Sequence, residues 1–368
     1  MVGRTPRSAA DAPVGLRGMD ESDLVGEAGP GGSARTRGSA PPGSASHAGK
    51  GRPLSRQSGD WRSLVKRRLL DAHLYSLDRM NYQLGPRCFA LALAVAALAS
   101  AAGPELDSAR KFYDSTEFDK SLQVLQAIPA KDGAVYALIG RNHYMRSDYK
   151  KAGEALEKAV AADPSNSEFE LWLARAYGRR AETSSPLTAP GHATRARQHF
   201  EKSVQLNPRN LEALSDLFEY YLEAPGFLGG GIQKAAAIAG RMAALDAAEG
   251  QWAQAKLAEE KKDYHAVEEH LQWAIDAAPQ QVGRQLDMAR FLAKQGRFAE
   301  AERSFARAEA ISPASAQLLY ARAETYIKYN KNLELAKELL KRYLSMKLTV
   351  DDPPRPGAEK LLRQVQGI

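Results

Sequence analysis

The chain contains a single cysteine, Cys88, among its 368 residues. One thiol cannot form an intrachain disulfide, and it cannot build a cysteine-based metal site. The apolar run that includes Cys88 covers residues 88–99, about 12 residues, whereas a helix needs about 20 to cross a bilayer. The sequence therefore predicts neither a disulfide framework nor a membrane-spanning helix at this run.

Catalytic motifs are also missing. The sequence has no H-E-x-x-H and no G-x-S-x-G pattern, so the zinc-peptidase and serine-hydrolase arrangements are excluded. His265 and His270 are five residues apart, which places them on different faces of a helix, whereas His192 and His199 are seven apart and can share one. Asp and Glu lie beside Lys and Arg, which is typical of a solvated helix face. We predict a protein that is not an enzyme, with no catalytic residue, cofactor or metal site.

The basic charge is not spread evenly. The formal net charge is +7, from 51 Lys+Arg and 44 Asp+Glu. Residues 1–79 hold 13 and 8 of these, a net of +5, so the remainder holds 38 (51 − 13) and 36 (44 − 8), a net of +2. A nearly neutral body lacks the cationic surplus on which phosphate binding relies, so no nucleic-acid partner is expected.

The first 102 residues differ in composition from the rest. Residues 1–57 are rich in Gly, Pro, Ser, Ala and Arg, and such a stretch buries too little apolar surface to offset its ordering entropy. From Met80 the pattern becomes that of a secretory signal peptide: Arg87, the apolar run, then small residues near Ala101. We predict a disordered leader at 1–79, a signal peptide at 80–102, and a periplasmic or secreted bacterial protein. Met80 is then the natural start.

Three alternatives for this region remain open. The leader can be a disordered tail before an uncleaved segment, which would anchor the protein to the membrane facing the periplasm. It can be an organelle transit sequence, although its eight acidic residues argue against that. The apolar run can also be a buried first helix.

An internal repeat fills the remainder of the chain. In four segments a small residue is followed by a large residue four positions later, a small residue three later, and proline five later. The four copies are Ala152, Leu156, Ala159, Pro164; Ala196, Phe200, Ser203, Pro208; Val267, Leu271, Ala274, Pro279; and Ala301, Phe305, Ala308, Pro313. Small residues allow two helices to approach closely, and proline prevents continuation of the second helix. Weaker copies are centred on Ala109 and Ala235, and Ala336 marks a last one.

This pattern resembles the second helix of the tetratricopeptide repeat, and residues such as Gly140, Ala174 and Tyr177 resemble its first helix. The resemblance implies an all-α fold, an α-solenoid of antiparallel helix pairs. We predict about six to seven pairs over residues 104–346, followed by a Pro-rich turn and a capping helix at 347–368. Such arrays are stabilised cooperatively because each repeat covers its neighbour.

Two insertions interrupt the 34-residue period. Residues 181–192 are polar and contain Pro and Gly, so we expect a longer loop there. Residues 224–235 contain Gly229, Gly230 and Gly231 just before a helix, where backbone amides are able to hold an anion. The alternative, which we favour, is a tight turn that uses positive φ angles.

The resemblance also implies a concave groove lined by the first helices, with a protein or an extended peptide as partner. By register, the groove-facing residues are Arg141, Tyr144, Met145, Arg175, Arg179, Glu219, Lys256, Arg290, Tyr320 and Glu324. The basic stretch at Arg141, Arg175 and Arg179 predicts an acidic partner segment; the alternative is that these arginines only keep a helix face soluble. We expect a scaffold for protein contacts in the periplasm or cell envelope. A membrane-tethered scaffold and an enzyme's accessory subunit with an anion-binding turn are the alternatives.

Overall fold

The computed structural model describes residues 103–367, so the predicted leader, the signal segment and Cys88 lie outside the described residues. The described part is helical and contains no strand. None of its helices is long and apolar enough to cross a membrane. The helices are α3 (Gly103–Asp114), α4 (Phe118–Ala127), α5 (Gly133–Met145), α6 (Tyr149–Ala162), α7 (Ser167–Thr183), α8 (Ala189–Leu206), α9 (Leu211–Glu223), η3 (Gly226–Leu228), α10 (Ile232–Leu245), α11 (Ala247–Glu260), α12 (Tyr264–Ala277), α13 (Val282–Lys294), α14 (Phe298–Ile311), α15 (Ala316–Lys328), α16 (Leu333–Ser345) and α17 (Arg355–Gln366).

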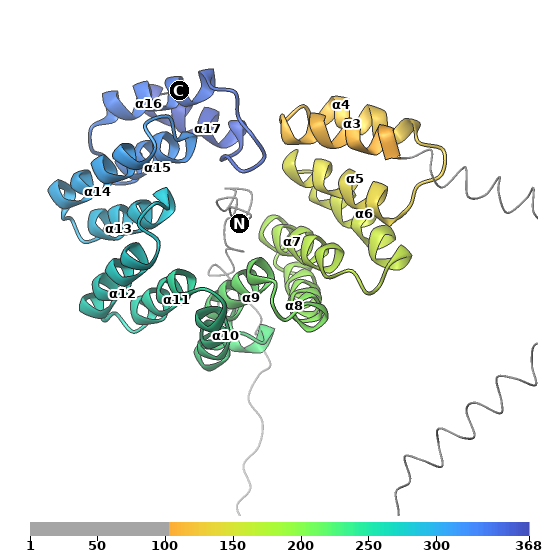
Figure 1. The fold of residues 1–368 in the computed structure, drawn as a ribbon, viewed down its shortest axis with the longest axis horizontal. Helices are drawn as coiled ribbons and strands as arrows, with labels where there is room; N and C mark the ends of the chain where they lie inside the picture. Colours follow the sequence, from red (N-terminus) through yellow and green to blue (C-terminus); the bar gives the residue numbers. More distant parts are fainter. Residues whose placement is uncertain (1–102, 368) are drawn as a thin grey trace, which may run out of the picture. The chain divides into compact units, whose positions relative to one another are not determined.

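Helices α3 to α16 form successive antiparallel pairs, and each pair packs on the next (Figure 1). The first helices α3 and α5, α5 and α7, and α13 and α15 also contact one another directly. The stack is therefore tighter on the side of the first helices, which face inward in Figure 1. The predicted all-α solenoid of antiparallel pairs is confirmed.

The repeated small residues lie where the two helices of a pair meet. Ala152, Ala196 and Ala301 are all buried, and so are the large residues Leu156 and Phe200 four positions after the first two. Gly140 on α5 shows how close the approach is, because a Cβ placed there would lie 2.5 Å from Cγ of Leu156. Close packing of this kind explains why the repeat requires small side chains.

The turns inside the pairs are also repeated. In five of the seven, the first helix ends with one residue in the left-handed conformation: Thr116, Ser147, Lys262, Gly296 and Asn330. The next N–H donates to a carbonyl five residues back, as Asp148 does to His143 and Asp263 to Ala258, both at 2.9–3.0 Å. This is the Schellman end of a helix, which satisfies carbonyls that the helix leaves unpaired.

The other two turns belong to the inserted segments, and the first prediction for them is wrong. Residues 181–192 do not form a long loop: α7 has 17 residues and α8 has 18, against 13 and 14 in α5 and α6. Only residues 184–188 connect the two helices. Polar residues on a helix face and a proline at the start of α8 are compatible with helix, so composition alone misassigned the segment.

The core differs between the two halves of the array. One cluster of buried side chains extends from Leu106 on α3 to Leu257 on α11. Beyond it, the described residues form three smaller clusters, over α11–α14, α13–α15 and α15–α17. The last one includes Ala358 of α17, which covers the end of the stack. The N-terminal half is thus a continuous core and the C-terminal half a series of separate contacts.

Candidate functional site

The ten predicted groove residues all lie on first helices, from α5 to α15, but their surroundings differ. In the N-terminal half, the side chains of Tyr144, Met145, Arg175 and Glu219 are buried. In the C-terminal half, Lys256, Arg290 and Glu324 have side chains that are 42–45% exposed. The predicted residues thus lie on one series of first helices. Their side chains are accessible to a ligand in the C-terminal half and mostly buried in the N-terminal half.

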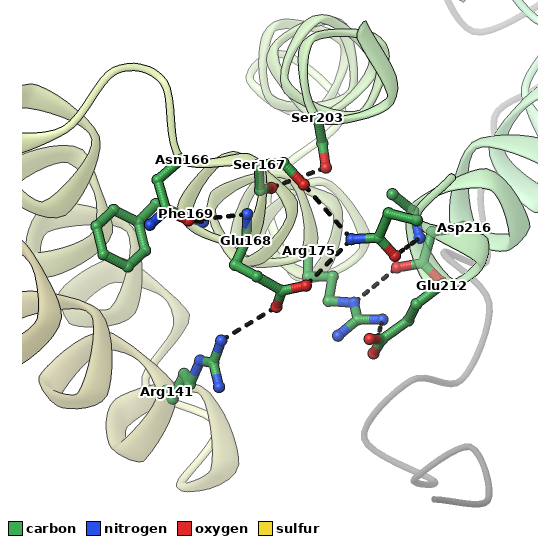
Figure 2. Close-up of polar contacts among 11 residues, drawn as sticks. Arg141, Asn166, Ser167, Glu168, Phe169, Arg175, Ser203, Glu212 and Asp216 are labelled. Atoms are coloured by element: carbon green, nitrogen blue, oxygen red, sulfur yellow. Dashed lines mark hydrogen bonds and ion pairs between the residues drawn. The ribbon is translucent and has the colours of Figure 1, made fainter. Parts of the chain in front are cut away.

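Arg175 is the most enclosed charge of the N-terminal half, with 3% of its surface exposed. Its Nε donates to Asp216 at 2.6 Å and its Nη2 donates to Glu212 at 2.7 Å, both on α9 (Figure 2). Its guanidinium also lies 4.9 Å from the ring centre of Trp172. A buried cation is tolerated only when carboxylates compensate it, as they do here.

Arg141 connects α5 to the next pair. Its Nη2 pairs with Glu168 at 3.3 Å (Figure 2). Its guanidinium lies 4.7 Å from the centre of the same Trp172 ring. Burial lowers the pKa of Arg141 below its ordinary value. Glu168 in turn accepts a hydrogen bond of 3.1 Å from Nδ2 of Asn210, which caps α9. One chain of contacts thus joins α5, α7 and α9.

The third predicted arginine, Arg179, pairs with Glu182 and contacts the ring of Tyr149. Each of the three arginines thus has a carboxylate partner within the chain. The basic stretch predicted from the sequence is therefore paired with carboxylates of the same chain. The solubility alternative is wrong for Arg175, because a side chain with so little exposure cannot solvate a surface.

A pocket of about 340 Å³ lies on the C-terminal half of the inner face, among α11, α12, α13 and α15. Its apolar wall includes the buried residues Val267, Leu271 and Phe291. Three predicted groove residues, Lys256, Arg290 and Glu324, line the same pocket. The structure therefore brings these three together around an apolar floor.

Seven charged side chains line this pocket. The cations are Lys256, Arg290, Lys294 and Lys328, and the carboxylates are Glu259, Asp287 and Glu324, so the balance is 4 − 3 = +1. Arg290 lies 3.9 Å from both Asp287 and Glu324, at the outer limit of an ion pair. Lys328 is exposed and, within the described part of the chain, has no carboxylate at ion-pair distance. Long, half-exposed pairs are weak and are able to exchange partners.

Tyr320, the remaining predicted residue on α15, does not line the pocket. Its ring packs 5.6 Å from the ring of Tyr343, and its hydroxyl lies close to Gly357 of α17. Burial raises its pKa to about 12. Tyr320 therefore holds the capping helix against the last pair.

The glycine-rich turn does not offer its amides to an anion. The N–H groups of Gly229, Gly230 and Gly231 donate to the carbonyls of Gly226, Pro225 and Tyr221, at 2.9, 3.2 and 2.7 Å. The predicted positive φ angles are confirmed, at 87° for Gly229 and 152° for Gly231. The anion-site prediction is thus corrected, since the donors that it needed are used within the turn.

Two contributors were missed at the sequence level. Lys328 lies four residues after Glu324 on α15, and Lys294 lies four after Arg290 on α13, so the i, i+4 spacing of helix faces would have found both. Trp172 lies three residues before Arg175 on α7, so the same helix spacing would have found that contact, whereas only the fold shows that Arg141 of α5 meets the ring too.

The histidines that were predicted to share a face do so. The rings of His192 and His199, both on α8, stack on Tyr177 with centroid distances of 5.9 and 5.7 Å. His199 also contacts Glu170 at 2.6 Å. Over residues 103–367 no group of three or more His, Cys, Asp or Glu is arranged to hold a metal ion.

No protein-family model matches the sequence, and no curated protein matches it. Among solved structures, the chain is similar to a tetratricopeptide repeat protein from Parabacteroides merdae, with 16% identity, a TM-score of 0.49, and coverage of 73% of this chain and 99% of that one. It is also similar to a tetratricopeptide repeat protein of Thermus thermophilus, with 18% identity, a TM-score of 0.35, and coverage of 64% and 97%. These likenesses concern the fold alone. The helix pairs, their small buried residues and the repeated turns define the class: a tetratricopeptide-type α-solenoid.

Proposed function

We propose that this solenoid is a non-enzymatic scaffold that binds an extended segment of a partner protein in the pocket among α11, α12, α13 and α15. The observation that carries the proposal is the pocket itself, in which an apolar floor is surrounded by half-exposed charges. Sites of this kind bury an apolar anchor and use a few polar groups to orient it.

The charge balance of the pocket indicates the chemistry of the segment. Among the described residues Lys328 has no carboxylate at ion-pair distance, and Arg290 is held only by pairs of 3.9 Å. A partner carboxylate beside an apolar residue would satisfy both cations while its neighbour covers the floor formed by Phe291 and Leu271. The acidic segment first expected at Arg141, Arg175 and Arg179 is therefore expected further along the array.

We further propose that the scaffold is exported to the periplasm or cell envelope through residues 80–102. The support is the signal pattern that begins at Met80. An uncleaved segment that tethers the scaffold to the membrane is the alternative. N-terminal sequencing of the natively expressed protein distinguishes them: a start just after Ala101 or Ala102 supports cleavage, and a peptide from residues 1–60 contradicts a start at Met80.

The binding proposal is tested with a displayed library of random peptides selected on the full chain. We expect selected peptides to share an apolar residue next to Asp or Glu. Substitution of Lys328 and Arg290 by Ala should weaken their binding about tenfold or more. Lys341→Ala is the matched control, because this lysine is exposed on α16 and does not line the pocket.

Two outcomes would contradict the proposal. If the selected peptides share no apolar residue next to Asp or Glu, the proposed chemistry of the partner segment is contradicted. Equal affinity for the Lys328→Ala, Arg290→Ala variant and for the Lys341→Ala control would remove the pocket as the binding site.

A further inference from the structure

Three of the four large apolar residues that the described chain exposes lie at consecutive turns. Leu187 is 91% exposed between α7 and α8, Phe227 is 44% exposed between α9 and α10, and Tyr264 is 42% exposed where α12 begins. Because the helices of each pair are antiparallel, all turns inside pairs lie at one edge of the stack. We name the three segments 184–188, 224–231 and 261–264 the turn edge. Single exposed apolar residues are ordinary, whereas these three lie along one edge of the stack.

The turn at 224–231 holds its apolar tip in a fixed position. The hydroxyl of Tyr220 donates to the carbonyl of Leu228 at 3.0 Å, and Leu228 itself is buried. A Cβ on Gly230 would lie 1.8 Å from the carbonyl oxygen of Ala224, so the chain here admits only glycine. Leu228 is thus anchored inside, whereas its neighbour Phe227 keeps 44% of its surface exposed at the tip of the turn.

The turn at 184–188 is likewise ordered by its own bonds. The backbone N–H groups of Thr188 and Ala189 both donate to the carbonyl of Ser185 at 3.0 Å. Leu187 lies between Pro186 and Thr188 and contributes almost nothing to the core. Each of the two insertions that interrupt the repeat therefore exposes one apolar side chain, Leu187 in the first and Phe227 in the second, on neighbouring helix pairs.

Lysines lie near two of the three tips. Lys234 follows the second turn, and Lys261 and Lys262 come before Asp263 and Tyr264; all three lysines are exposed. In residues 103–367 none of the three has a carboxylate at ion-pair distance, and the ammonium of Lys234 instead donates to the carbonyl of Gly229 at 2.8 Å. The turn edge therefore combines exposed apolar side chains with three exposed lysines that form no ion pair among the described residues, and it holds one exposed carboxylate, Asp263.

We propose that the turn edge binds the surface of a lipid bilayer that contains anionic lipids. Apolar tips of this size insert between headgroups, and the lysines next to them meet lipid phosphates. Protruding tips favour a deformable surface over a rigid protein partner, whose surface would need three matching pockets. The surface is separate from the groove, it does not depend on the proposed partner segment, and it requires no uncleaved signal.

Vesicle co-sedimentation of the full chain tests the proposal. Vesicles of phosphatidylcholine mixed with phosphatidylglycerol are compared with vesicles of phosphatidylcholine alone. We expect the variant Leu187→Ser, Phe227→Ser, Tyr264→Ser to bind mixed vesicles at least tenfold more weakly than the unaltered chain. Trp273→Ser is the matched control, because Trp273 is 48% exposed but lies within α12 and not at the turn edge. Replacing Lys261 and Lys262 by Gln should remove most of the preference for anionic vesicles.

A second measurement reads the position of one tip directly. In a Cys88→Ser background, Leu187→Cys carries a polarity-sensitive dye, and Trp273→Cys carries it in the control. A blue shift with mixed vesicles at position 187 and none at 273 supports insertion of the edge. Equal binding by the triple variant, or equal dye shifts at both positions, overturns the proposal, including the case in which residues 1–102 alone bind the vesicles. If the triple variant loses helical signal, Leu187→Ser alone replaces it.

Discussion

The two halves of the inner face are built from equivalent first helices and from the same kinds of residue, but the charged residues have different roles in each half. Around α7 and α9, arginines and carboxylates are buried against each other, as Arg175 is against Asp216. Around α13 and α15, Arg290 and Glu324 are almost half exposed and 3.9 Å apart. In the N-terminal half the charged side chains form ion pairs that join neighbouring repeats. In the C-terminal half they remain accessible to a ligand. Arginines on an inner face are thus not by themselves evidence of a binding site. Whether such an arginine is able to bind a ligand depends on the carboxylates that already contact it within the chain.

The core follows the same division. One continuous cluster underlies the N-terminal half, and separate clusters underlie the C-terminal half. Because the core of the C-terminal half is divided into separate clusters, we expect small shifts between its helix pairs to disturb fewer contacts. We infer that the half with the pocket is the more adaptable one.

The largest expected effect concerns the buried arginine. Arg175→Ala leaves Asp216 without its cation and should cost about 3 kcal/mol or more of unfolding free energy. Arg290→Ala removes only long, half-exposed pairs and should cost less than about 1 kcal/mol. Urea unfolding followed by circular dichroism, with hydrogen exchange to locate the loss, measures both. Similar losses of unfolding free energy in the two variants would contradict the proposed difference between the two halves.

Glycine substitutions sharpen the contrast in packing. In Gly140→Ala the new Cβ would lie 2.5 Å from Leu156 and 3.1 Å from the carbonyl of Ala152, so we expect a loss of about 1–3 kcal/mol. Gly283 on α13 has nothing within 4 Å of the same position, so Gly283→Ala should instead gain up to about 1 kcal/mol. Thermal unfolding of the two variants gives the signs, and a gain in both would show that α5 and α6 are not closely packed.

Acid should affect the N-terminal half selectively through His143. Burial lowers the pKa of His143, although Asp148 opposes the shift, so the folded chain binds this proton less readily than the unfolded chain. The contribution to stability is therefore complete above the unfolded pKa of about 6.5 and is lost as the pH falls from there through the lowered folded value. Hydrogen exchange of α5 between pH 7 and pH 5 measures it. His143→Gln should flatten this dependence; an unchanged slope would rule out His143 as its source.

The smallest expected effect concerns a feature that the two halves share, the left-handed residue in the turns inside the helix pairs. Ser147 and Lys262 occupy the same left-handed position of equivalent turns, with φ of 61° and 59°. Ser147→Gly and Lys262→Gly should each stabilise the chain by up to about 1 kcal/mol, because glycine adopts this conformation without steric cost. Thermal unfolding should give equal gains, and a loss in either would mean that its side chain makes a compensating contact.

Much of the fold was predictable because the repeat encodes it locally. Ala152 allows two helices to approach closely, Leu156 fills the space between repeats, and Pro164 ends the helix. Each of these roles follows from the spacing of the residues in the sequence. The length of α7 and α8 was not predictable, because polar residues at 184–192 are compatible with loop and with helix until the neighbouring pair is in place.

The site was predictable only as a list of inward positions. Register placed Arg175 and Arg290 on the first helices of their pairs, where the structure has them, but it did not predict which carboxylates they contact. Asp216 lies 41 residues after Arg175, and only tertiary packing brings the two side chains to 2.6 Å. Exposure, which separates a structural arginine from one that is able to bind, is likewise a property of the whole array.

The most direct test of the account is the affinity of one selected peptide for two variants of the full chain. One variant carries Arg290→Ala and Lys328→Ala in the C-terminal half, and the other carries Arg179→Ala, a half-buried arginine of the N-terminal half. The account predicts a loss of about tenfold or more for the first and less than about twofold for the second. A larger loss for Arg179→Ala than for the pocket variant would contradict it.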